Sequence, residues 1–309
     1  MIPKVTIIMA TFNRAHFILE TLYSIQMQTF KKWECLIIDD GGTDNTLETI
    51  QPILKLDHRF QYIKRTDNYK KGLPGCRNYG LDLAKGEFII FFDDDDIVHP
   101  QNIELCVKEL TNNDISFCRY LRAVFTNDFD YKFDFSTIYT SFYIDINDIE
   151  KVLKNELPFN SCAVMWKKER FTENRFEELL MYAEEWELYS RILSKGYKGI
   201  SIEKCLFYGR KHPNSNTGEY YTQNPIRLNS KKEAVRLVAY NLASKKLLTP
   251  SLLKYLAGLA IGFRDTKLLN DILAKPGIKT NNKLFLQLKY WLFPLWKVYK
   301  KTIKKLTYK

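Results

Sequence analysis

Short apolar runs alternate with helical patterns along the first hundred residues of the chain. The apolar runs, which favour buried β-strands, are Val5–Met9, Cys35–Ile38, Phe60–Lys64 and Phe88–Phe92. The segments between them place apolar side chains with a helical period and cover residues 17–27, 43–54 and 73–85. Strand runs with little polar interruption are typical of parallel sheets that are covered on both faces. The alternation predicts an α/β fold with a mixed, mainly parallel sheet flanked by helices.

The second half of the chain is less regular. We expect further strands at residues 115–124, 162–166 and 198–208, and helices at residues 147–155 and 182–195. From about Pro225 onward the pattern is helical. The chain is therefore expected to hold an α/β domain over residues 1–220 and a helical C-terminal region over residues 221–309.

Three of the expected strand ends carry polar residues. These polar segments lie at residues 10–14, 39–44 and 93–96. Parallel strands bring their carboxyl ends to the same edge of a sheet, where the ligands of such folds bind. The three segments should therefore meet in one crevice.

Four consecutive aspartates, Asp93–Asp96, directly follow the apolar run Phe88–Phe92. Carboxylates at this spacing repel one another, and a divalent cation removes the repulsion. Oxygen ligands suit Mg²⁺ or Mn²⁺, and side chains alternate along a strand, so Asp93 and Asp95 can point the same way. The alternative is a solvated acidic turn that caps a helix near Pro100.

The charge of the chain is unevenly distributed. The sequence has 47 Lys and Arg against 36 Asp and Glu, a formal net charge of +11. Residues 245–309 hold 15 basic and two acidic residues, a net charge of +13, which leaves residues 1–244 at −2. This distribution argues against a protein that coats nucleic acid with its whole surface.

The last residues have a basic amphipathic pattern that predicts a terminal helix. Its two faces are Lys297, Lys300, Lys301, Lys304 and Lys305, and Leu292, Leu295, Trp296, Tyr299, Ile303 and Leu306. Aromatic residues opposite lysines fit the surface of an anionic membrane. The alternative is an ordinary helix that packs on the body and exposes its lysines, and no RNA-binding module is visible.

Neither a membrane span nor a signal peptide is expected. No uncharged apolar stretch reaches the ~18 residues that a span requires, and the N-terminus enters a strand pattern at once. The six cysteines form no CxxC pair and have no zinc-site spacing. We interpret them as reduced thiols of a cytoplasmic protein, and nucleic acid is not among its expected partners.

An ordered set of motifs resembles the family 2 glycosyltransferases, which have the Rossmann-like GT-A fold. The matching segments, within roughly residues 3–215, are Ala10–Arg14, Gln28–Phe30, Ile38–Asp44, Arg77–Glu87, Phe91–Asp96 and Ala183–Leu188 with Arg191. Residues 220–309 match no usable part of the family. The resemblance implies a nucleotide-diphosphate-sugar donor, here a UDP-sugar, a divalent cation (Mn²⁺ or Mg²⁺) and inversion at the anomeric carbon.

The resemblance also implies roles for individual residues. The expected lining of the base and ribose pocket is Ala10, Phe12, Asn13 and Asp40, with Asp40 accepting a hydrogen bond from the uracil imide. The residues expected around the rest of the donor are Arg77, Asp93, Asp94 and Arg210. The expected cation ligands are Asp95, Asp93 and His212, a DxD arrangement completed by a histidine. The alternatives are a turn-forming role for Asp40, a surface position for Arg77 and a solvated loop position for His212.

The acceptor hydroxyl needs a general base. The family places this base as the Asp of a Glu-Asp pair at the start of a helix, and this sequence has Glu184-Glu185 there instead. Glu185 takes the position of the base, with one methylene more than aspartate, and Glu184 is its catalytic neighbour. Stabilisation by the helix dipole is the alternative explanation for both carboxylates.

The resemblance implies a metal-dependent transferase of hexosyl or N-acetylhexosaminyl groups, in EC class 2.4. By the same resemblance, the acceptor is expected to be a saccharide or a lipid-linked saccharide of bacterial surface polysaccharide biosynthesis. With the basic C-terminal helix, this leads us to expect the protein on the inner face of the cytoplasmic membrane. One alternative is a sugar nucleotidyltransferase, whose glycine-rich signature is missing from Ala10–Arg14. The other is a catalytically degenerate membrane-associated scaffold, against which the intact aspartate cluster argues.

Overall fold

The computed structural model describes residues 2–126, 128–212, 215–275, 281 and 283–292. The chain divides into two compact units, Met1–Ser230 and Lys231–Lys309, with the boundary inside helix α8 (Pro225–Ser244). The expected α/β domain over residues 1–220 stays a prediction. The terminal helix expected around Lys297–Leu306 lies outside the described residues.

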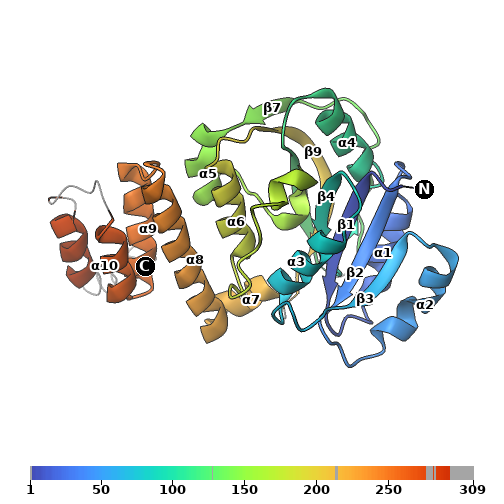
Figure 1. Ribbon diagram of the computed structural model, residues 1–309, viewed down its shortest axis with the longest axis horizontal. Helices are drawn as coiled ribbons and strands as arrows, with labels where there is room; N and C mark the ends of the chain where they lie inside the picture. Colours follow the sequence, from blue (N-terminus) through green and yellow to red (C-terminus); the bar gives the residue numbers. More distant parts are fainter. Residues whose placement is uncertain (1, 127, 213–214, 276–280, 282, 293–309) are drawn as a thin grey trace, which may run out of the picture. The chain divides into compact units, whose positions relative to one another are not determined.

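A mixed sheet of nine strands forms the centre of the first unit, counted over the described part of the chain (Figure 1). The strand order is β3-β2-β1-β4-β8-β6-β9-β5, and β7 pairs with β9. The strands are β1 (Val5–Thr11), β2 (Trp33–Asp39), β3 (Phe60–Lys64), β4 (Phe88–Phe92), β5 (Ile97–Val98), β6 (Phe117–Phe125), β7 (Ser141–Ile144), β8 (Val164–Lys167) and β9 (Gly199–Arg210).

The four strands predicted from the first apolar runs are parallel neighbours. Strand β1 pairs with β2 on one side and β4 on the other, and β2 pairs with β3. Their carboxyl ends therefore share one edge of the sheet, as the sequence pattern predicted. Beyond β4 the direction changes, because β8 is antiparallel to both β4 and β6, while β6 and β9 are parallel.

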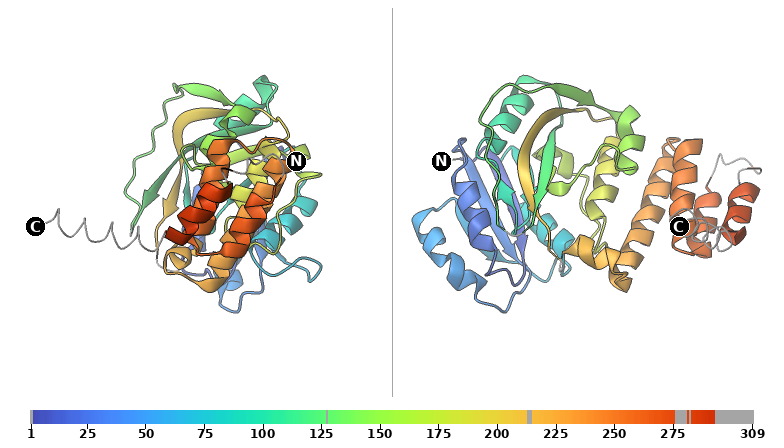
Figure 2. Two further views of the ribbon diagram at one scale, coloured as in Figure 1. Left: turned by 90° about the vertical axis from the view of Figure 1, so that its left-hand side faces the viewer. Right: turned by 180° about the vertical axis from the view of Figure 1, so that it is seen from behind.

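Helices flank this sheet and make up the described part of the second unit (Figure 2). The helices of the first unit are α1 (Ile18–Gln26), α2 (Thr46–Leu56), α3 (Leu73–Leu83), α4 (Asn102–Asn112), α5 (Ile149–Leu153), α6 (Glu184–Leu193) and α7 (Asn216–Tyr221). Short 3-10 helices are η1 (Ile146–Asp148), η2 (Ser161–Ala163) and η3 (Lys168–Phe171). After α8 come α9 (Pro250–Gly262) and α10 (Thr266–Leu273), and residues 283–292 are also helical.

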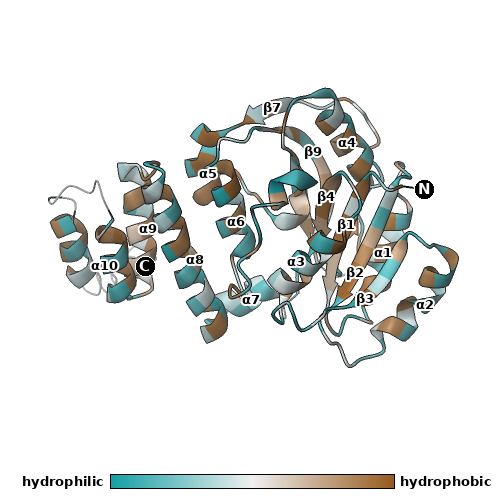
Figure 3. Cartoon of the chain, viewed as in Figure 1, coloured by the Kyte–Doolittle hydropathy of each residue, from teal (hydrophilic) through white to brown (hydrophobic). Residues whose placement is uncertain are grey.

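Each face of the sheet has its own apolar layer, because side chains alternate along a strand. On one face, Ile7 and Ile37 belong to a core that includes residues of α1, α2 and α4. On the other face, Leu36 and Ile38 pack with Cys76 of α3. Strands β1 and β4 accordingly carry mostly hydrophobic colours in Figure 3. The predicted α/β fold, with helices on both faces, is confirmed.

Two further sequence expectations concern the whole chain. All six cysteines are free thiols. Among the residues that the structure describes, no helix has the length and apolar character to cross a bilayer.

We predict that Gly80→Ala lowers stability. Gly80 of α3 faces β1, and a Cβ atom there would stand 2.5 Å from Cγ2 of Ile8. Overpacking of this kind typically costs about 1–3 kcal/mol. Thermal unfolding should show a lower midpoint for Gly80→Ala. Gly258→Ala, in helix α9 with open space around its Cβ position, is the matched control and should not lower it.

Candidate active site

One cavity of about 1000 Å³ lies where the polar strand ends meet. The first half of the chain contributes the ends of β1, β2 and β4 to its lining, including Phe12, Asp40 and Asp93–Asp96. The second half contributes η2, the start of α6 and the residues from Arg210 to α7. The predicted crevice therefore exists, and it brings together segments that are distant in sequence.

Residues expected to hold a nucleotide base line one part of this cavity. Ala10, a partly buried residue near the end of β1, lines the cavity with Phe12, which is 44% exposed. The Lys71 ammonium lies 4.7 Å from the centre of the Phe12 ring. An exposed aromatic ring beside a cation offers a stacking surface for a flat, anionic ligand.

Asp40 and Asn13 hold the loops that shape this part of the cavity. One carboxylate oxygen of Asp40 accepts a hydrogen bond from Nε of Arg65 at 2.7 Å, and the other accepts one from the Gly72 amide at 2.9 Å. Asn13 has a left-handed backbone (φ 55°), and its Oδ1 accepts from the Thr43 amide at 2.7 Å. Both residues therefore fix loop geometry, as local hydrogen bonds of Asp and Asn often do.

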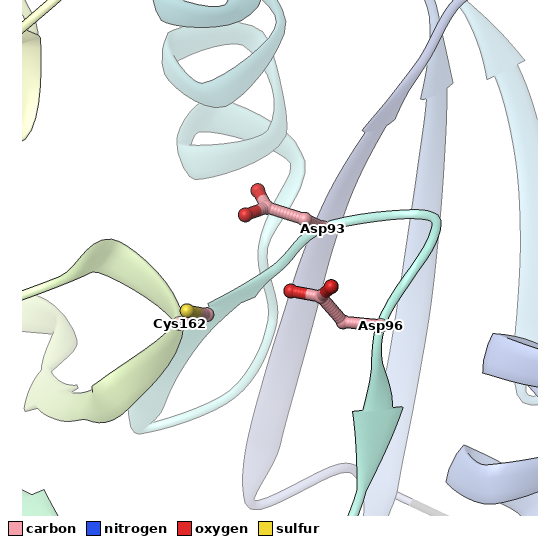
Figure 4. A group of neighbouring side chains, drawn as sticks. All are labelled: Asp93, Asp96 and Cys162. Carbon is pink, nitrogen blue, oxygen red and sulfur yellow. The ribbon is translucent and has the colours of Figure 1, made fainter. Parts of the chain in front are cut away.

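The four aspartates fill the loop between β4 and β5. Figure 4 shows the carboxylates of Asp93 and Asp96 projecting from this loop, with the Cys162 thiol of η2 nearby. Their ligand atoms lie within 4.8 Å of one another, which would suit a metal ion. Burial raises the pKa of the Cys162 thiol, so it remains protonated and is a poor ligand. The carboxylates are therefore the available donors.

Basic side chains surround the aspartates. Arg14 approaches Asp94 and Asp95, with nitrogen–oxygen distances of 3.4 and 3.9 Å. Nε2 of His212 lies 2.8 Å from a carboxylate oxygen of Asp95. The backbone amide of Arg210 donates to Asp96 at 2.7 Å. The structure therefore brings His212 and Arg210 to the aspartate cluster.

The crowded carboxyl groups hold their protons tightly. Burial raises the pKa of Asp94 to about 7, with a smaller contribution from the charge of Asp95. Burial also raises the pKa of Asp96 well above its ordinary value, and Asp93 and Asp95 add to the shift. Removal from water and mutual repulsion are the two physical causes.

Arg77 lies inside the molecule and not on the surface of α3. It is 2% exposed, and its guanidinium donates to Glu184 at 2.9 Å, to Ser161 at 2.9 Å and to Asp93 at 3.3 Å. It also lies 5.5 Å from the ring centre of Phe91. Arg77 lines the cavity, but its charge is directed mainly at these protein partners.

Glu184 and Glu185 begin helix α6 and have different surroundings. Glu184 is 5% exposed and pairs with Arg77; burial raises its pKa to about 8, with repulsion from Glu185 as the next cause. Glu185 is only partly buried and lines the cavity. The indole of the next residue, Trp186, donates a hydrogen bond to the Leu153 carbonyl of α5 at 3.0 Å. Glu185 is therefore the more accessible carboxylate of the pair.

The backbone before α6 is held in an unusual conformation. Ala183, at the N-cap, has a left-handed backbone with φ 64°. The Tyr182 amide donates to Oγ of Ser230 at 2.8 Å, and the same hydroxyl donates to the Tyr182 carbonyl at 2.7 Å. Arg227 donates to the Met181 carbonyl. The first turns of α8 thus fix the position of Glu184 and Glu185.

Sequence reasoning missed several residues of this site. Arg14 lies in one of the motifs that resemble the family, yet its pairing with the aspartates was not predicted. Arg65 directly follows β3. A basic residue at the end of a fourth strand could have indicated that Arg65 belongs to the site. Arg122 of β6 lines the cavity with its charge acting on Asp93 and Asp96, and Ser230 lies far along the chain. Neither of these two has a local sequence signal.

The chain is similar to proteins of one sequence family. Residues 6–176, more than half of the chain, match the model described as glycosyl transferase family 2. The GalNAc(5)-diNAcBac-PP-undecaprenol beta-1,3-glucosyltransferase of Campylobacter jejuni is 44% identical over 94 residues, 30% of this chain and 30% of that protein. The UDP-Glc:alpha-D-GlcNAc-diphosphoundecaprenol beta-1,3-glucosyltransferase WfgD of Escherichia coli is 37% identical over 113 residues, 37% of this chain and 43% of that protein. The chain spans less than half the length of either relative.

A solved structure shares the fold over nearly the whole chain. The crystal structure of S. aureus TarS 1-349 in complex with UDP matches with a TM-score of 0.65 at 17% identity, covering 93% of this chain and 91% of that chain. This likeness supports the fold class predicted from the sequence.

We predict that Asp94→Asn changes the pH dependence of stability. The Asp94 pKa is about 7 in the folded chain against an ordinary value of 3.8, so the folded state binds this proton more tightly. Stability that depends on Asp94 is then present at low pH and is lost as pH rises from about 4 to about 7. The asparagine side chain cannot ionise. The difference between the thermal midpoints of the variant and of wild type should therefore rise in the variant's favour as pH increases over this range.

Differential scanning calorimetry at about pH 4.5 and about pH 7.5 measures this relative midpoint. Asp67→Asn, at an exposed position outside the cavity, is the control and should keep a constant difference from wild type. An equally constant difference for Asp94→Asn would show that the proton is not held more tightly in the folded chain.

Proposed function

The chain belongs to glycosyl transferase family 2, and we propose that it is an inverting glycosyltransferase that uses a UDP-sugar. The proposed acceptor is a saccharide linked to a lipid through a diphosphate. The two relatives named above act, by their names, on undecaprenol-linked saccharides. The E. coli relative's name includes UDP-Glc, and TarS was solved with UDP. These likenesses support the donor and acceptor classes, and the cavity supports the reaction.

The cavity offers separate surroundings for the parts of such a donor. Phe12, with Lys71 beside its ring, and the loops held by Asp40 and Asn13 suit the base and ribose. Arg210 and Lys211, which line the cavity near His212, suit the diphosphate because guanidinium and ammonium groups bind phosphate oxygens well. Arg77 contributes mainly by holding Asp93 and Glu184 in place.

The aspartate cluster fits a divalent cation. Its donor set is hard and rich in oxygen, which suits Mg²⁺ or Mn²⁺. We propose that Asp95 and Asp93 hold the cation, with His212 as a further ligand, since His212 already contacts Asp95. When bound, the cation would neutralise charge on the departing diphosphate.

Glu185 is the proposed general base. The single observation that carries this assignment is the pairing of Glu184 with buried Arg77, which leaves Glu185 as the accessible carboxylate of the pair on the cavity wall. Glu185 would accept the proton of an acceptor hydroxyl as its oxygen attacks the anomeric carbon. The bond from that carbon to the diphosphate oxygen breaks with its electron pair, so UDP departs and the configuration inverts.

The proposed location is the inner face of the cytoplasmic membrane, as a peripheral protein. A lipid-linked acceptor would be presented there. The net charge of +13 over residues 245–309 is attracted to anionic lipid headgroups.

We predict that Glu185→Gln abolishes transfer and keeps donor binding. Glutamine has nearly the same shape as glutamate but cannot take the acceptor proton, and loss of a general base typically lowers the rate by about 10²–10⁴-fold. Transfer to a lipid-linked acceptor and UDP binding by calorimetry are the two measurements. UDP affinity should stay within about threefold of wild type.

The neighbouring Glu184→Gln is the matched control. Because burial favours the protonated form of Glu184, glutamine resembles the state already present, and transfer should fall less than in Glu185→Gln. If Glu184→Gln lost transfer while Glu185→Gln kept it, the assignment of the base would be reversed.

We predict that UDP binding requires a divalent cation at Asp95. With Mn²⁺ or Mg²⁺ present, UDP at about 100 times its dissociation constant should stabilise the chain by about 2.7 kcal/mol, seen as a higher thermal midpoint. The rise should disappear with a chelator and in Asp95→Asn. Parallel scans with GDP test the choice of nucleotide, and an equal rise with UDP and chelator would contradict the proposed cation site.

A further inference from the structure

The helical residues 283–292 belong to the second unit and pack against the rest of that unit through one face. Leu286 and Tyr290, one turn apart, are 4% and 8% exposed. The Tyr290 hydroxyl accepts a hydrogen bond from Thr266 at 2.7 Å, at the start of α10, and donates to the Arg264 carbonyl at 3.3 Å. These contacts fix which face of the helix is turned inward.

The opposite face of this helix is apolar and exposed. Its residues are Leu284, Phe285, Leu288, Trp291 and Leu292, which are 61%, 60%, 58%, 73% and 48% exposed. At 3.6 residues per turn they fall within an arc of about 120°, centred opposite Leu286 and Tyr290. A helix on the surface of a water-soluble protein carries polar residues on its outward face. We call these five residues the apolar face.

An exposed, contiguous apolar face marks an interaction site. Two features of the chain select the partner. Lys283 and Lys289 belong to the same helix, and residues 245–309 carry a net charge of +13, so the partner is anionic. Tryptophan, phenylalanine and leucine together with lysines are the composition of helices that lie in a lipid headgroup region.

Other occupants fit less well. A stable dimer interface takes about 20–30 residues a side, which the five residues of the apolar face do not supply. An acidic soluble protein would satisfy the lysines but not five large apolar side chains. A bilayer surface satisfies both, because its acyl boundary takes apolar side chains and its headgroups take the cations.

We propose that the apolar face of residues 283–292 docks the protein onto an anionic lipid bilayer, with the helix lying along the surface. The ten described residues of this helix extend about 15 Å, half the thickness of a bilayer core, so this stretch fits within the interface. This inference gives the location under "Proposed function" a specific surface. The proposed function supplies only the biological reason for membrane docking. Vesicle binding itself requires neither donor nor acceptor.

Co-sedimentation of the full chain with vesicles tests this docking. The vesicles contain phosphatidylglycerol and phosphatidylethanolamine, and phosphatidylcholine vesicles are the neutral comparison. Phe285→Gln/Trp291→Gln should weaken binding to the anionic vesicles at least tenfold. Because both side chains are exposed, the thermal midpoint should match that of wild type. Leu56→Gln, which changes an exposed leucine (86%) at the end of α2, is the control and should bind like wild type.

Three outcomes would overturn the inference. The double variant binds anionic vesicles as tightly as wild type, or wild type binds neutral vesicles equally well. Alternatively, sedimentation velocity shows a wild-type dimer that the double variant loses, which assigns the face to a second copy of the chain. Failure of Glu185→Gln to reduce transfer leaves all three measurements untouched, so the two proposals fail separately.

Discussion

A buried guanidinium holds the candidate active site together. Arg77 comes from α3, and its partners Asp93, Ser161 and Glu184 come from the β4–β5 loop, η2 and the start of α6. A charge withdrawn from water is tolerated only when it is paired and hydrogen-bonded, so Arg77 requires these segments to meet around it. The same arrangement engages Glu184, so Glu185 is the less buried of the two glutamates that line the cavity. The difference between the two glutamates is thus a consequence of the contact between Arg77 and Glu184.

The aspartate cluster imposes a second constraint on the same place. Strand β4 is fully buried up to Phe92, and the chain then presents Asp93–Asp96 in succession at the sheet edge. The raised pKa values of Asp94 and Asp96 show that nearby arginines do not fully offset burial and repulsion. A site with excess carboxylate is suited to attract a cation, whereas a cluster fully neutralised by arginine would not be.

The sequence was most informative where topology follows from local pattern. Apolar runs predicted β1 to β4, and parallel pairing then required their polar ends to meet, so the positions of Asp40 and Asp93–Asp96 were predictable. It was least informative where side chains from distant segments choose partners. Arg77 and Glu184 are 107 residues apart, and nothing local shows that they pair. Ser230 fixes the backbone of Tyr182 through a hydroxyl on an ordinary helix. Strand β5 has only two residues, too few for any periodicity.

The uneven charge of the chain has a physical meaning in this arrangement. Residues 1–244 are nearly neutral in sum, so the positive charge at the candidate site is local, and Arg14 and Arg210 place it beside the aspartates. The excess of +13 lies elsewhere in the sequence, on a region whose helix over 283–292 turns apolar side chains outward. Long-range attraction to an anionic surface is screened within about 8 Å at physiological salt. Charge alone therefore cannot hold a protein firmly, and an apolar face beside it adds the short-range contact that electrostatics lacks.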